Sequence, residues 1–310
     1  MFIINNANIS IRFQLKFASL VNNFCTSIYF QIFRLSIFFL MIFGLTNCSN
    51  TRLAYSIVEE FIKKEAKYFI NVDEKEEIIL KKKVSLMVAW HRSTMLPIYA
   101  DYLRNIADEI QLNSNNPTYV VKAIDNAKFL IEETVIGLTP YISAYLVRHQ
   151  TTDALEFKKK KIELRRKERL KELKETDSVL YERRVKKTKS NFERFFGDIT
   201  NEQSKLIQEY SHITLPDSMT RFNNRTMKQD AFIQFLNTKP NEKELTIFLN
   251  RLLLRGHEIV NPDYLIFSKV WLDRFITFLE NMLKISSKKQ QEKIITKLRN
   301  YAEDFSSTSE

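Results

Sequence analysis

The chain has 310 residues and a mass of 36.8 kDa, with 48 Lys and Arg against 37 Asp and Glu and a formal net charge of +11. This length suits one large domain or two small ones. Four Gly and six Pro are too few turn residues for a β-sandwich, a β-barrel or a nucleotide-binding sheet. No G-x-G-x-x-G or G-x-x-x-x-G-K-[ST] phosphate loop occurs, and two Cys with four scattered His exclude a zinc ribbon and a disulfide framework.

Residues 1–47 are typical of an export signal. They contain no acidic residue, and an apolar run of about a dozen residues, LSIFFLMIFGL over 35–45, directly follows Arg34. That length matches the core of a signal peptide, whereas a helix that crosses a bilayer needs roughly 20 residues. The run ends at Leu45, three residues before Cys48, and this ending resembles the signal of bacterial lipoproteins.

The resemblance implies that Cys48 is acylated and becomes the first residue of the mature protein. Asn47 departs from the usual Gly, Ala or Ser at its position, which bears on the efficiency of cleavage. Ser49 stands where Asp would mark retention at the inner membrane. We therefore expect a lipoprotein of the outer membrane of a Gram-negative bacterium, facing the periplasm. Residues 1–33 are long for a segment before a signal core, as a start codon placed too far upstream would explain.

Both cysteines agree with export. Cys25 lies in the segment that would be removed, and Cys48 would carry the lipid. The mature body would then hold no free thiol in an oxidising compartment.

Downstream of the signal, the pattern predicts a single all-α domain over residues 48–310. Asn116-Pro117, Thr139-Pro140 and Asn261-Pro262 each place a capping residue before a proline, and Gly197 and Gly256 follow apolar periodic segments. We expect a multi-helix bundle of about ten to twelve helices, without a sheet, over residues 52–70, 74–90, 94–112, 117–136, 140–150, 153–189, 191–196, 201–213, 217–236, 241–255, 262–284 and 288–305.

Capping boxes support several of these helix starts. Asp73 is followed by Glu76 and Thr200 by Gln203, each three residues on, and Ser286 or Ser287 opens the last helix. The segment 262–284 is apolar nearly all round, so we expect it to be buried among other helices.

Most of the positive charge lies in one segment. Residues 158–189 hold 15 bases and six acids, whereas the rest of 48–310 holds 30 bases and 31 acids. A narrow apolar stripe runs along this segment, so we expect one long basic helix over about 153–189, roughly 50 Å in length. Its cations are candidates for binding an anionic surface, namely Lys158, Lys159, Lys160, Lys161, Arg165 and Arg166. The alternative is a solvated helix that packs through its apolar seam.

Catalytic and metal-binding patterns are scarce. The four His form no H-E-x-x-H motif, and Glu209 with His212 supplies one half of the pattern that di-iron bundles need twice. No G-x-S-x-G elbow occurs. We therefore expect a non-enzymatic protein with no metal and no cofactor.

The most distinctive local text is VAWHRSTMLPIYADYL over residues 88–103. Trp90, His91, Arg92 and Tyr99 could hold a ligand by stacking and by charge, and they are the candidate binding residues. The alternative is that they fasten two helices together.

These residues also carry a resemblance to a family. Trp90-His91-Arg92 followed by Leu96-Pro97-Ile98-Tyr99, the text that begins at Cys48, residues 192–203 and residues 297–304 are similar to an uncharacterised family of lipoproteins of Gram-negative bacteria, a domain of unknown function. The resemblance covers nearly all of 48–310. It implies an all-helical body and a membrane address, and it brings no known activity.

A second motif is similar to that of another class. Ile199-Thr200-Asn201-Glu202-Gln203 resembles the Leu-Thr-x-x-Gln signature of periplasmic helical chaperones of the Spy type, with Ile in place of Leu. A capping box alone also explains this pentad.

Three hypotheses of function follow. The first is a non-catalytic envelope scaffold or interaction protein, attached to the membrane by lipid on Cys48, that binds an unidentified envelope protein or anionic component. It involves no nucleic acid and no small-molecule substrate. The second is a holdase-type chaperone that uses the basic arm 153–189 and its apolar seam. The third is an inner-membrane protein whose N-terminal helix is retained and which binds anionic lipid.

Overall fold

The computed structural model describes residues 50–113 and 116–309, with side chains from residue 57 onward. Throughout these residues the chain is helical and contains no β-strand, which confirms the predicted all-α bundle. The predicted signal segment 1–47 and Cys48 lie outside the described residues. The α-helices are α3 (Asn50–Phe69), α4 (Glu74–Trp90), α5 (Leu96–Leu112), α6 (Tyr119–Leu146), α7 (Thr152–Leu173), α8 (Asp177–Phe196), α9 (Asn201–Ile213), α10 (Asp217–Asn237), α11 (Glu242–Leu254), α12 (Tyr264–Lys284) and α13 (Lys288–Ser309). A π-helix, η1 (His91–Met95), and a 3-10 helix, η2 (Gly256–Glu258), complete the described elements.

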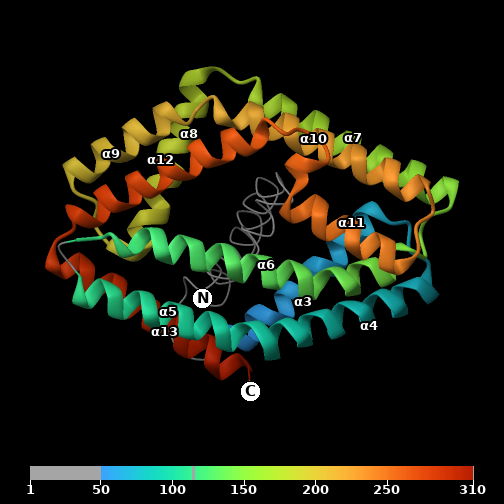
Figure 1. The fold of residues 1–310 in the computed structure, drawn as a ribbon, viewed down its shortest axis with the longest axis horizontal. Helices are drawn as coiled ribbons and strands as arrows, with labels where there is room; N and C mark the ends of the chain where they lie inside the picture. Colours follow the sequence, from blue (N-terminus) through green and yellow to red (C-terminus); the bar gives the residue numbers. More distant parts are fainter. Residues whose placement is uncertain (1–49, 114–115, 310) are drawn as a thin grey trace, which may run out of the picture.

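The helices follow two long edges of the molecule. In Figure 1, α7, α9, α10 and α12 follow the upper edge, α4, α5 and α13 follow the lower edge, α6 and α11 lie between them, and α8 descends from the upper edge across α12. The most extensive helix contact among the described residues joins α5 to α13, and the next joins α6 to α11. Segments from opposite ends of the described chain therefore pack directly on one another.

Capping side chains begin several helices where the sequence predicts them. Asp73 accepts a hydrogen bond from the backbone N–H of Glu76 at 2.8 Å, at the start of α4. Thr200 and Gln203 form a complete capping box before α9. Gly197 ends α8 with φ of 80°, a backbone conformation that favours glycine. Local chemistry therefore sets these boundaries.

Two capping boxes are joined to each other in the core. Gln203, at the start of α9, and Gln290, at the start of α13, exchange two side-chain hydrogen bonds of 3.0 Å. Gln290 also donates to the backbone oxygen of Asp198 at 2.8 Å and accepts from the backbone N–H of Ser287 at 3.0 Å. Each oxygen and nitrogen of these two buried amides thus has a hydrogen-bond partner, and the bonds hold the two helix starts together.

The main apolar core lies where α5, α8, α9, α12 and α13 meet. Its fully buried members include Leu96, Ala100, Ile207, Met282 and Phe305. Two smaller clusters pack α3 against α4 and α7 against α10 and α11. The described body therefore has one large core with two satellites.

The predicted break between residues 90 and 94 is wrong. α4, η1 and α5 form one uninterrupted helical segment, and His91 itself has α-helical dihedrals. Pro97 lacks the N–H that would bond to the backbone oxygen of Ser93, and the π-turn lies directly before it. A widened turn therefore accommodates this proline inside a continuous helical segment.

The predicted helix start at Pro140 is also wrong, because α6 runs through it without interruption. Proline has no N–H for the backbone oxygen of Ile136, four residues earlier. The hydroxyl of Thr139 donates to that oxygen at 3.2 Å. The sequence predicts Thr139 as a helix cap, but its hydroxyl replaces the missing N–H donor of Pro140 within α6.

The predicted long basic helix is divided into α7 and α8. The break covers residues 174–176, where Lys174 ends α7 and Thr176 adopts an extended conformation before α8. α8 then continues to Phe196, so the separate helix predicted over 191–196 is its final turn. The charge is thus divided between two successive helices; in Figure 1, α7 follows the upper edge, whereas α8 turns away from it and crosses α12.

α12 is buried over its C-terminal half only, contrary to the expectation that it is covered all round. Phe278, Met282 and Leu283 are buried, whereas the Ile266 side chain is 67% exposed and Val270 is exposed as well. The apolar surface near the start of this helix is therefore available to solvent.

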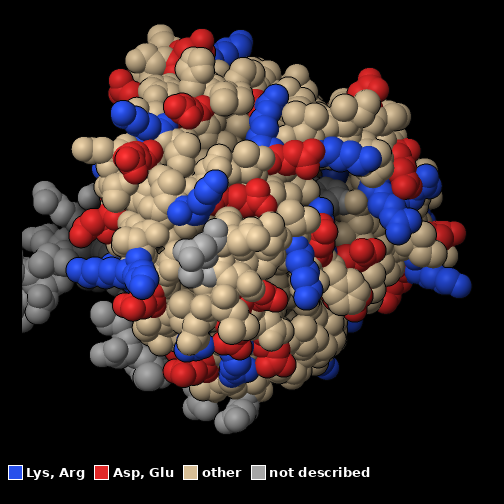
Figure 2. Space-filling view, turned by 60° about the vertical axis from the view of Figure 1, so that its left-hand side comes forward, with Lys and Arg blue, Asp and Glu red and all other residues tan. Residues whose placement is uncertain are grey.

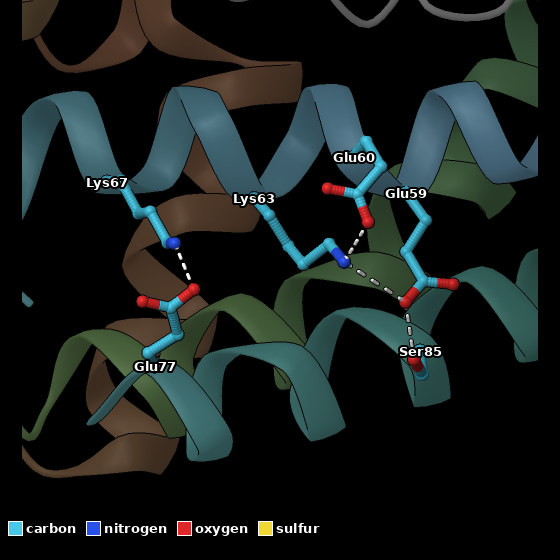
Figure 3. A network of polar contacts seen from close by, with 6 residues as sticks. All are labelled: Glu59, Glu60, Lys63, Lys67, Glu77 and Ser85. Atoms are coloured by element: carbon cyan, nitrogen blue, oxygen red, sulfur yellow. Dashed lines mark hydrogen bonds and ion pairs between the residues drawn. The ribbon is translucent and has the colours of Figure 1, made fainter. Parts of the chain in front are cut away.

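Charges outside the basic arm are mixed in sign. On the face shown in Figure 2, basic and acidic side chains alternate over the surface. Figure 3 shows one such network between α3 and α4, in which Lys63 pairs with Glu59 and Glu60, and Ser85 donates to Glu59 at 2.6 Å. Lys63 and Glu59 are partly buried in this network, whereas Glu60 is exposed.

Candidate functional site

η1 brings two of the four candidate binding residues together. The hydroxyl of Tyr99 is hydrogen-bonded to Thr134 and lies 3.5 Å from Nε2 of His91. Thr134 gives its own hydrogen to the backbone oxygen of Leu130 at 2.7 Å. Tyr99 is therefore the donor to Thr134, which leaves a lone pair of its oxygen directed toward Nε2 of His91.

This polar chain is sealed inside the helices. His91, Tyr99 and Thr134 are all buried, and burial lowers the pKa of His91 to about 4. The imidazole is therefore neutral at pH 7. The geometry of this polar chain favours the alternative that His91, Tyr99 and Thr134 hold η1, α5 and α6 together.

The other two candidate binding residues, Trp90 and Arg92, do not belong to this polar chain. Trp90 lies against Gly137 of α6, with the ring of Tyr141 at 6.4 Å. Arg92 is exposed. The four residues do not converge on one enclosed ligand site.

Replacing His91 by Gln is expected to reduce the loss of unfolding free energy that the protein shows as the pH falls from 7 to 5. The pKa of this imidazole is 6.5 when it is exposed and about 4 in the fold, so between these values the unfolded chain binds a proton that the folded chain does not. Stability therefore falls as pH falls, by about 2 kcal/mol between pH 7 and pH 5 from this group. Urea unfolding at both pH values measures the difference, and equal pH dependence in wild type and His91→Gln would contradict the assignment.

The basic arm packs against the body through its apolar seam, as the alternative interpretation expects. Lys158 is 2% exposed and donates to the backbone oxygen of His149 at 3.5 Å. Burial lowers the pKa of its ammonium group to about 8. Lys159 and Lys160 are exposed, whereas Lys161 lies over the rings of Tyr68 and Phe157.

The two arginines of the arm bind neighbouring helices. Arg165 forms a two-pronged contact with Glu65 of α3, at 2.7 and 3.1 Å. Arg166 donates to Gln229 and to the backbone oxygen of Thr226, both at 2.8 Å, and to Asp230 at 2.7 Å. These side chains hold α7 on the body, and the exposed cations are confined to the other side of the helix.

A cluster of arginines that sequence reasoning missed lies where α8, α9, α10 and α12 approach one another. We call it the arginine cluster, and it comprises Arg184, Tyr210, Asp217, Ser218, Arg221, Tyr264, Trp271 and Arg274. Its members come from three consecutive helices, α8, α9 and α10, and from α12. No local spacing in the chain signals such a cluster.

Its contacts leave the positive charge incompletely balanced at Arg184. The Arg184 guanidinium donates to Ser218 Oγ at 3.2 Å and makes no ion pair among the described residues. Arg274 approaches Asp217 Oδ1 at 3.6 Å, and the Arg221 guanidinium lies 5.5 Å from the centre of the Trp271 ring. The second carboxylate oxygen of Asp217 is buried and has no hydrogen-bond partner.

Burial dominates the electrostatics of the cluster. Burial, assisted by the charge of Arg221, lowers the pKa of Arg184 to about 10. Burial also lowers the pKa of Arg221, with Asp217 opposing it. The pKa values of Tyr210 and Tyr264 are raised by burial, so both phenols are protonated donors at pH 7. The cluster thus presents cationic and neutral donors beside one carboxylate.

The described residues contain neither a metal-type cluster of side chains nor a helix that could span a membrane. Within 50–113 and 116–309, no three His, Cys, Asp or Glu side chains are grouped as a metal site would need. Among the helices of this region, none combines the length and the apolar character that crossing a bilayer requires.

The fold defines a multi-helix, all-α protein. The sequence model of DUF6279, described as a family of unknown function, matches residues 68–265. The chain therefore belongs to this family. No curated protein and no solved structure matches the chain.

Proposed function

We propose that the protein is a lipid-anchored, non-catalytic interaction protein of the Gram-negative envelope. It is attached through Cys48 to the periplasmic side of the outer membrane. The observation that carries the proposal is the apolar run before Cys48 together with the start of α3 at Asn50. Cys48 then stands two residues before Asn50, the first described residue of α3.

This spacing has a mechanical consequence. Two extended residue steps reach about 7 Å, so a lipid on Cys48 would hold α3 against the membrane surface. Each buried methylene contributes about 0.8 kcal/mol, and more than one acyl chain gives stable attachment. The protein would then act where the helical body meets its partners, close to the lipid head groups.

Replacing Cys48 by Ser is expected to release the protein from the membrane fraction. The chain offers a matched control, because Cys25→Ser changes the other cysteine and should leave attachment intact. Fractionation of cells that express the full chain, with detection of the C-terminal region, measures the partition. Equal retention of both variants would contradict lipid anchoring.

The same experiment distinguishes the inner-membrane hypothesis. A retained apolar N-terminal segment would hold the chain in the membrane whether or not Cys48 is present. In that outcome Cys48→Ser would stay with the inner membrane, and the binding of anionic lipid would become the leading hypothesis.

The holdase hypothesis takes second place because of the burial of the arm. The seam it would use includes Leu155, Ile162 and Leu173, and all three are buried. A client would therefore need other apolar surfaces, such as the exposed start of α12. The pentad that resembles the Spy-type signature forms the capping box at the start of α9. Its Gln203 is also hydrogen-bonded to Gln290, at the start of α13.

A further inference from the structure

The arginine cluster is built unlike a set of surface ion pairs. Surface arginines normally reach a carboxylate or water, and a buried guanidinium normally has a paired acid. Arg184 is largely covered, and its one hydrogen bond among the described residues goes to the neutral hydroxyl of Ser218. A guanidinium in this position retains most of its five N–H donors for another acceptor.

One side chain of the cluster reaches solvent. The side chain of Arg274 is 41% exposed, whereas that of Asp217, which it approaches, is 7% exposed. Arg274 therefore stands at the rim of the cluster, with Arg184 and Arg221 further inside. An anion could reach the interior donors past this side chain.

Asp217 restricts the kind of anion. As a carboxylate it only accepts hydrogen bonds, and its buried Oδ2 has no partner. A fully ionised anion such as sulfate would be repelled by that oxygen. A phosphate group keeps a proton in part near pH 6–7, and its P–OH can donate to Oδ2 while its other oxygens accept from the arginines.

We propose that the arginine cluster is a binding site for a phosphate group that retains a proton, either inorganic phosphate or the headgroup of a phosphomonoester lipid. Arg184 and Arg274 would donate to the ionised oxygens, and Asp217 would accept from the protonated one. This phosphate site is a separate proposal from the lipid anchor and does not depend on Cys48. Either proposal can therefore fail without the other.

Calorimetric titration of the full chain in an uncharged detergent at pH 6.5 tests the site. One arm uses inorganic phosphate, a second uses sulfate, and a third uses vesicles of neutral lipid with or without phosphatidic acid. We expect phosphate or phosphatidic acid to bind at least about tenfold more tightly than sulfate. Tighter binding to the vesicles than to free phosphate would assign the lipid source, and the reverse would assign the free anion.

Variants connect the binding to these side chains. Arg184→Gln and Arg274→Gln should each weaken binding about tenfold or more, as expected for one charge-assisted contact. Arg251→Gln is the matched control, since Arg251 is an exposed arginine paired with Glu258 elsewhere. Asp217→Asn should bring the affinities for sulfate and phosphate together, because an amide can also donate.

Several results would overturn the proposal. They are the absence of binding in both phosphate arms, equal affinity for sulfate in the wild type, and unchanged binding in Arg274→Gln. Arg274 is partly exposed, so its replacement tests the site even if Arg184→Gln fails to fold. Weaker binding in Arg251→Gln, equal to that in Arg274→Gln, would indicate unspecific charge attraction and would also overturn it.

Discussion

Truncation of Phe305 to Ala is expected to lower the free energy of unfolding by about 3–5 kcal/mol. Phe305 is 0% exposed and lies on α13, which makes the most extensive helix contact of the described residues with α5. Its ring lies 6.3 Å from that of Tyr99, beside the buried His91. Removal of the ring would leave a cavity between helices that cannot collapse without moving α13.

The matched control is Phe129→Ala, because the Phe129 side chain on α6 is 60% exposed. Exposed substitutions of this kind usually change stability by less than about 0.5 kcal/mol. Urea denaturation followed by circular dichroism compares the two variants with wild type. A similar small effect of both would contradict the docking of α13 on α5.

Gly137→Ala is expected to destabilise the protein by about 3 kcal/mol, although alanine is the better helix former. A Cβ at Gly137 would lie 1.9 and 2.0 Å from two ring carbons of Trp90 and 2.8 Å from a third. A rigid indole cannot bend away, so either α6 or the turn before η1 would have to shift. The expected cost exceeds the gain in helix propensity of about 1 kcal/mol.

A double-mutant cycle isolates this contact. In a Trp90→Leu background the obstruction is gone, so Gly137→Ala should be neutral or slightly stabilising there. The coupling between the two substitutions is then the quantity measured by chemical denaturation. Additive effects would show that the indole does not lie over Gly137.

Features set by neighbouring residues were predictable from the sequence. The cap of Asp73, the box of Thr200 with Gln203, and the terminator Gly197 each act within one turn of the chain. The all-α class followed because the same signals recur along the whole body. In these places local chemistry and the tertiary structure agree.

The two proline positions show why some boundaries were wrong. Pro140 reads as a helix start, but the hydroxyl of Thr139 supplies the hydrogen bond that proline cannot. A break is predicted between residues 90 and 94, but a π-turn there carries the helix on through Pro97. Compensation of this kind depends on side-chain placement that periodicity does not report.

The charged residues show the wider limit of sequence reasoning. Lys158 belongs to a run of four lysines that predicts a solvated face, yet it points into the body and is buried. Arg184 looks like one of many cations in the same segment, yet it meets Arg221 and Asp217 only after α8, α10 and α12 have packed. Such contacts between distant segments determine the candidate site, and no motif announces them.

We propose that the protein reaches the envelope as a lipoprotein anchored at Cys48. The most direct test is the mass of the mature N-terminal peptide, taken from the membrane fraction of cells that express the full chain. We expect a peptide that begins at an acylated Cys48 in the wild type, and we expect this peptide to be absent in Cys48→Ser. An unmodified peptide that begins upstream of Cys48 would contradict it.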